Sequence, residues 1–174
     1  MPYSIFFANL LRNLITVWAL IGGFILLLIV FLNVSSILGS IFFKPLPGDF
    51  ELTKIGIAVA VFCFLPYCQL HRQNVAAEIF TSWVNIKTRL LLSLIASILA
   101  FLFSILLVWR MFEGMLDQKA YNYTTTILQF PIWIAFIPVL FSLFLLAGAS
   151  FLTIKQDWNS GLILNNRNDV KGRP

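Results

Sequence analysis

The stretch from Asn13 to Phe43 reads NLITVWALIGGFILLLIVFLNVSSILGSIFF and contains no charged residue. As an α-helix it would be about 46 Å long, more than the roughly 30 Å hydrocarbon core of a bilayer. Lipid offers the backbone no hydrogen bonds, so a stretch this long and apolar is expected to cross the membrane as a helix. Three further uncharged, apolar stretches follow at 55–70, 90–109 and 120–154. The sequence therefore predicts an all-α integral membrane protein with four transmembrane helices.

The rest of the chain is short enough to connect these helices within one membrane domain, residues 1–174. The expected spans are 14–41, 52–70, 89–110 and 128–154. Two further helices are predicted to lie in the membrane interface, at 2–12 and, between the second and third spans, at 74–88. The second of these is amphipathic and places Trp83 at head-group depth. A short turn with incidental apolar residues is the alternative for 74–88.

The distribution of charge predicts the orientation. The net charge is +5, and eight of the twelve Lys and Arg residues lie before the first span, between the second and third, or after the fourth. The positive-inside rule therefore places both termini and the middle connection in the cytoplasm. This one-sided excess suits anionic membrane lipids and argues against nucleic acid as a partner. Trp18 is expected at the cytoplasmic interface, where tryptophans gather.

No Asp, Glu, Lys, Arg or His lies in the middle of any span, although proteins that move ions usually keep one there. His71 is the only histidine, which argues against a multi-histidine metal site and a Ser–His nucleophile. We therefore expect no enzyme activity, no catalytic or metal-binding residue and no cofactor in this chain. Asn33, Ser35 and Ser36 form the most polar cluster and are expected to bond helix to helix. The alternative is an ion site in a stand-alone, homo-oligomeric small exporter or channel.

Three stretches carry a family resemblance. They are KPLPGDFEL at 44–52, LPYCQLHR at 65–72 with Val75 and Glu78-Ile79-Phe80 beyond it, and PIW at 131–133 followed by Pro138. In order and spacing they resemble the small, DctQ-type membrane subunit of the tripartite ATP-independent periplasmic (TRAP) transporters. Gly39 and Gln73-Asn74 depart from the pattern of that family.

The resemblance implies the small permease subunit of a sodium-coupled importer of organic acids, such as dicarboxylates or sugar acids. It also implies that the chain lies in the inner membrane of a bacterium. In such a system a periplasmic substrate-binding protein delivers the acid to a large multi-span subunit, which carries the sodium coupling. The small subunit enlarges and steadies the immobile scaffold, against which the transport domain of the large subunit moves as an elevator.

Two sets of residues are candidates for contact with these partners. The set expected at the interface with the large subunit is Arg72, Glu78 and Trp83. The alternative is that its two charged side chains face water and head groups. The set expected to dock the binding protein is Asp49, Glu51, Glu113 and Asp117. Their alternative is a role as ordinary solvated loop charges, which individually contribute little to binding.

Overall fold

The computed structural model describes residues 2–42, 47–71 and 86–171, and the statements below concern these residues. They form four helices, α1 (Pro2–Phe42), α2 (Asp49–Leu70), α4 (Ile86–Ala120) and α5 (Trp133–Lys171). Each contains a segment long and apolar enough to cross a membrane: Ala8–Ile41, Asp49–Leu70, Leu91–Ala120 and Trp133–Trp158. This confirms the prediction of an all-α protein with four helices able to span a bilayer.

The helices differ from the predicted spans mainly at their ends. α1 runs without a break from Pro2, so the segment expected at 2–12 is the first part of that helix. α4 continues past Arg110 to Ala120, because its polar final turns still favour a helix and Lys119 complements the helix dipole. α5 begins only at Trp133, since the residue before Pro131 is disfavoured in helical conformation. Most of the predicted interfacial helix at 74–88 lies outside the described residues.

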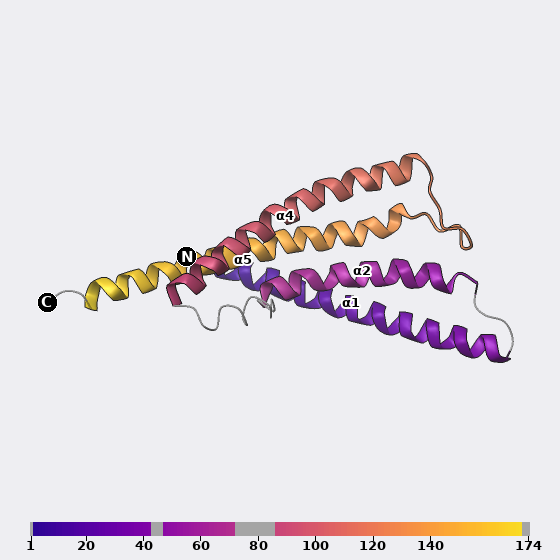
Figure 1. Cartoon of the computed structure of the whole chain (residues 1–174), viewed down its shortest axis with the longest axis horizontal. Coiled ribbons are helices and arrows are strands. Elements are labelled where there is room, and N and C mark those ends of the chain that lie inside the picture. The colour runs from indigo at the N-terminus through magenta and orange to yellow at the C-terminus, as the bar shows by residue number, and fades with distance from the viewer. Residues whose placement is uncertain (1, 43–46, 72–85, 172–174) are drawn as a thin grey trace.

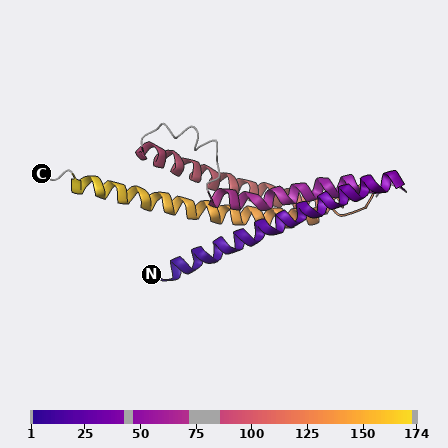
Figure 2. The ribbon, with the colours of Figure 1, turned by 90° about the horizontal axis from the view of Figure 1, so that it is seen from below.

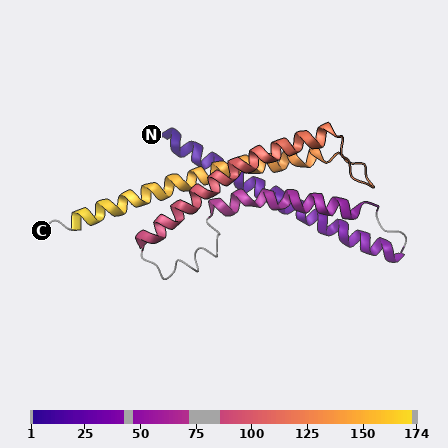
Figure 3. The same cartoon turned by 45° about the horizontal axis from the view of Figure 1, so that its top comes forward.

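The four helices lie in a row rather than in a closed bundle (Figure 1). Along this row the order is α4, α5, α2 and α1, and each helix packs mainly on its neighbours. A smaller contact joins α1 to α5, and Figures 2 and 3 show the N-terminal half of α1 crossing α5. The start of α1 and the end of α5 lie at one end of the molecule, here called the termini end. The opposite end, where α1 and α4 finish, is called the loop end (Figure 1).

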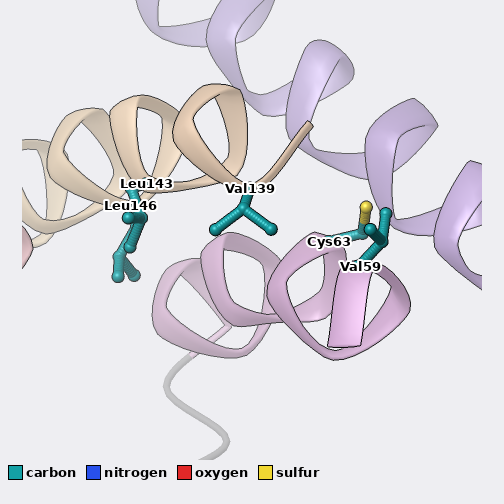
Figure 4. Close-up of a cluster of buried hydrophobic side chains, with 5 residues drawn as sticks. All are labelled: Val59, Cys63, Val139, Leu143 and Leu146. Carbon is teal, nitrogen blue, oxygen red and sulfur yellow. The ribbon is translucent and has the colours of Figure 1, made fainter. Parts of the chain in front are cut away.

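The buried core lies between α2 and α5, in the middle of the row. Val59 and Cys63 of α2 meet three side chains of α5, Val139, Leu143 and Leu146 (Figure 4). A second cluster joins α1 to α5 nearer the termini end, with Ile15 against Leu145 and Ala149. In lipid such contacts stabilise through close packing rather than through the exclusion of water. α5 is therefore the central helix, which contacts each of the other three.

Small residues allow α1 and α2 to approach closely. A Cβ atom added to Gly22 of α1 would lie 2.7 Å from the Cβ of Cys63. On the opposite helix, a Cβ added to Gly56 would lie 2.6 Å from Cδ1 of Ile29. Glycine at such points brings two backbones together, as is common between membrane helices. These two contacts fix where α1 and α2 pack.

Trp18, which we expected at the cytoplasmic interface, packs against α5. It is half-buried, and its Nε1 donates a hydrogen bond of 2.8 Å to Oγ of Ser142 on α5. Its ring also packs edge-on against Phe141, with 4.6 Å between the ring centroids. The indole N–H thus finds a hydrogen-bond partner across the contact between α1 and α5, which favours packing of this ring against α5.

Candidate functional site

Polar side chains join α1 to α2 towards the loop end. Nδ2 of Asn33 lies 3.0 Å from Oγ1 of Thr53 and 2.8 Å from the carbonyl oxygen of Ile29. The hydroxyl of Ser36 donates to the carboxylate of Asp49, at the start of α2. Asn33 and Ser36 therefore act as contacts between helices, as the first interpretation of this cluster predicted. Asn33 and Ser36, two of the three residues of the alternative ion site, are thus hydrogen-bonded within the protein.

Glu51 fastens the connection between α4 and α5 to the first turn of α2. Its Oε1 accepts a hydrogen bond of 2.9 Å from the backbone N–H of Ile127, and its Oε2 accepts one of 3.1 Å from Leu128. Leu128 also packs over Gly48, whose φ of +83° and lack of a Cβ make room for it: a Cβ there would lie 2.5 Å from Cγ of Leu128. We call these contacts the Glu51 clamp. They join α2 to the connection between α4 and α5 at the loop end.

The clamped segment, residues 121–132, is called the α4–α5 loop, and it has its own hydrogen bonds. The N–H of Thr125 donates to the carbonyl of Phe130 at 3.0 Å, and the N–H of Phe130 donates to the hydroxyl of Thr125 at 3.1 Å. Nearer the helices, the N–H of Ile132 donates to the carbonyl of Tyr123 at 3.1 Å. The side chains of Tyr121 and Tyr123 are exposed. The loop is thus an ordered structure that presents aromatic side chains.

The four acids predicted to dock a binding protein all lie at the loop end. Asp49 and Glu51 are in the first turn of α2, and Glu113 and Asp117 are one turn apart towards the end of α4. Glu113 pairs with Arg110 at 3.4 Å; the Arg110 side chain is largely exposed and that of Glu113 about half exposed, so the pair contributes little to stability. Asp117 is exposed as well. The carboxylate of Glu51 serves the clamp, and a docking role for all four acids stays a prediction.

The residues predicted to contact the large subunit cannot be placed. They fall outside the described part of the chain: Arg72, Glu78 and Trp83.

Asp157 is a buried acid that the sequence-based reasoning missed. It is only 1% exposed, and its Oδ2 accepts hydrogen bonds from the hydroxyls of Ser93 at 3.0 Å and Ser97 at 3.4 Å. These bonds join the first part of α4 to α5 towards the termini end. The fourth uncharged stretch stops at Ile154, so Asp157 lay outside the predicted spans. One signal in the sequence was the spacing of Ser93 and Ser97, which lie one turn apart and so place both hydroxyls on a single helix face.

Comparison with known proteins agrees with this architecture. A profile of the DctQ component of tripartite ATP-independent periplasmic transporters matches residues 26–159, which is more than half of the chain. The matched range contains both Glu51 and Asp157. Searches of curated proteins and of solved structures found no match. The profile describes a transporter component and not an enzyme, and four apolar helices make this a multi-pass membrane protein. The chain belongs to the DctQ family of TRAP transporter components.

Proposed function

We propose that this chain is the small permease subunit of a sodium-coupled, binding-protein-dependent importer of an organic acid of the dicarboxylate or sugar-acid type. Its role is to be the scaffold partner of the large multi-span subunit. Family membership supports this assignment. The observation that carries the scaffold role is that polar side chains of the spans bond one helix to another. Such an arrangement suits a part that stays still while its partner moves.

The cross-helix bonds are spread along the length of the row. They join α1 to α2, α1 to α5, and α4 to α5, through the pairs Asn33–Thr53, Trp18–Ser142 and Ser93–Asp157. Sliding or rotating any one helix would break at least one of these bonds, together with close packing at the glycines. Each bond is worth about 0.6–2 kcal/mol between membrane helices. These bonds and close contacts therefore favour one fixed arrangement of the four helices.

The outer helices of the row offer broad apolar faces to a partner. In the most apolar window of α4 only 11% of residues are buried within the chain, against 39% in α5. Many exposed side chains of α4 are large and apolar, among them Leu102, Phe103 and Leu106. α1 likewise exposes Phe24, Leu27 and Phe31. Helices of the large subunit and lipid tails are both suited to cover such faces, since neither requires polar groups from them.

The orientation that goes with this function places the termini end in the cytoplasm of a bacterium and the loop end in the periplasm. The excess of Lys and Arg at both termini and in the middle connection supports it. We expect green fluorescent protein fused to the C-terminus to fluoresce, and alkaline phosphatase fused there to be inactive. Alkaline phosphatase fused directly after Ala120 should be active. The opposite pattern of activities would show that the chain is inverted.

The proposed function is tested by reconstitution. The tagged chain is co-expressed with a large TRAP subunit and a substrate-binding protein from the same organism, purified in detergent and placed in proteoliposomes. We expect a stable complex with the large subunit, and uptake of the organic acid that needs both an inward sodium gradient and this chain. A homo-oligomer of this chain that transports or conducts alone would instead establish the exporter or channel alternative.

A further inference from the structure

We propose that Glu51 is a latch, whose bonds to the α4–α5 loop hold closed a hinge between two halves of the molecule. One half is the hairpin of α1 and α2, and the other is the hairpin of α4 and α5. When the latch is released, the loop and the first turn of α5 part from α2 at the loop end. The inference goes beyond the proposed function and concerns this chain alone, so its test needs no partner protein.

The buried core that joins the two hairpins stops short of the loop end. The first buried residue of α2 is Val59, about two helical turns beyond Glu51. The first buried residue of α5 is Val139, which belongs to the same cluster as Val59. The outer helices α1 and α4 meanwhile spread apart towards the loop end (Figures 1 and 3). Helix packing therefore joins the hairpins less tightly at this end than at the core.

Hydrogen bonds supply the connection that packing lacks there. Other bonds between the hairpins lie in the middle of the row or towards the termini end, as in the pairs Trp18–Ser142 and Gln69–Thr153. At the loop end, both carboxylate oxygens of Glu51 accept bonds from consecutive backbone N–H groups, those of Ile127 and Leu128. Bonds to an ionised acceptor are stronger than bonds between neutral groups. Within the described residues, Glu51 is thus the side chain that bonds one hairpin to the other at this end.

Pro138 gives α5 a place to bend between the clamp and the core. It lies inside α5, immediately before Val139. Proline has no backbone N–H and so cannot donate to the carbonyl oxygen of Ile134, and helices bend readily at such points. No residue of α5 before Pro138 is buried. Release of the clamp therefore frees the loop and the first turn of α5 without disturbing the core.

Asp49 allows the latch to be distinguished from general support of α2. It lies in the same first turn as Glu51 but bonds within its own hairpin, to the hydroxyl of Ser36 on α1. Both carboxylates are favourable at the start of a helix, because they complement the helix dipole. Of the two, it is Glu51 that bridges the hairpins. Removal of either acid therefore costs α2 a similar charge, while removal of Glu51 alone opens the latch.

The first test measures hydrogen exchange of backbone amides in the full-length chain in nanodiscs. We expect Glu51→Ala to speed exchange at Ile127 and Leu128 about tenfold or more, because these amides then open locally without the rest of the protein. Glu51→Gln keeps one acceptor oxygen and should give a smaller increase. Asp49→Ala should leave exchange in the α4–α5 loop unchanged.

The second test measures whether release of the loop opens the molecule. Spin labels are attached through Ile41→Cys near the end of α1 and Leu116→Cys near the end of α4, both at exposed positions. The background carries Cys63→Ala and Cys68→Ala, so that only these two positions are labelled. By pulsed electron paramagnetic resonance, we expect Glu51→Ala to lengthen the distance between the labels by several ångströms and to broaden its distribution.

Two outcomes would overturn the inference. If the distance distribution of Glu51→Ala equals that of the unsubstituted chain, the hairpins stay together without the latch. If Asp49→Ala lengthens the distance as much as Glu51→Ala, the cause is the loss of charge at the start of α2 and not the bond between hairpins. Should Glu51→Ala yield too little folded chain, Glu51→Gln is measured against Asp49→Asn, with the same direction of change expected and a smaller size.

Discussion

Gly22→Ala is expected to separate α1 from α2 and lower the stability of the protein, although alanine is the better helix former. The new methyl group would lie 2.7 Å from the Cβ of Cys63 and 3.3 Å from the carbonyl oxygen of Ala60. The first of these atoms is attached directly to the α2 backbone, so no rotation of a side chain can relieve the contact. Overpacking of this kind costs about 1–3 kcal/mol, which exceeds the roughly 1 kcal/mol that alanine contributes to helix propensity.

Gly23→Ala is the matched control, because it makes the same chemical change one residue along the same helix. The nearest atom to its new Cβ would be Cζ of Phe64 at 4.0 Å, which is ordinary contact. We expect Gly22→Ala to lower the Tm in detergent by several degrees and Gly23→Ala to leave it unchanged or raise it, as followed by tryptophan fluorescence. In a Cys68→Ala background, the buried Cys63 should react faster with a thiol reagent only in the Gly22 variant. Equal Tm values for the two variants would show that the close approach does not matter.

The existence of the four helices could be predicted from the sequence because the bilayer imposes it. A stretch such as Asn13 to Phe43, without a single charge, has no other stable conformation in lipid. The order and spacing of the Pro-rich turn, the Leu65–Arg72 stretch and Pro131-Ile132-Trp133 likewise resembled the family that the profile confirms. These signals depend on residue type along the chain, and not on which residues meet in space.

Helix packing could not be predicted in the same way, because lipid and protein interior are equally apolar. Leu143 is fully buried while its neighbour Phe144 is 63% exposed, and hydropathy does not distinguish them. The position of Trp18 depends on a hydroxyl of another helix, 124 residues away in the sequence. The role of Glu51 depends on two backbone N–H groups, which no side-chain pattern reveals. Contacts of this kind depend on which residues the fold brings together, so they cannot be predicted from the sequence alone.

Asp157→Ala is expected to weaken the contact between α4 and α5 more than any other single removal of a carboxylate in the described part of the chain. The side chain is 1% exposed and accepts hydrogen bonds from Ser93 and Ser97. Its removal takes away the acceptor of the buried Ser97 hydroxyl, and a buried group that loses its hydrogen-bond partner costs about 1–3 kcal/mol. α4 packs mainly on α5, so weakening this contact loosens the attachment of α4 to the other helices. We expect a fall in Tm of several degrees and less complex with the large subunit.

Asp117→Ala provides the comparison, because it removes the same group from an exposed position of α4, where substitutions change stability by about 0.5 kcal/mol or less. A second control removes the donors instead: Ser93→Ala with Ser97→Ala should cost less than Asp157→Ala, and all three changes together should cost less than the sum of the two. Such non-additivity is the signature of groups that act through one another. If Asp157→Ala and Asp117→Ala give the same Tm, the buried carboxylate contributes nothing to the contact. The packing of Phe101 against Phe151, at 6.4 Å between ring centroids, would then be left to hold α4 against α5 in this region.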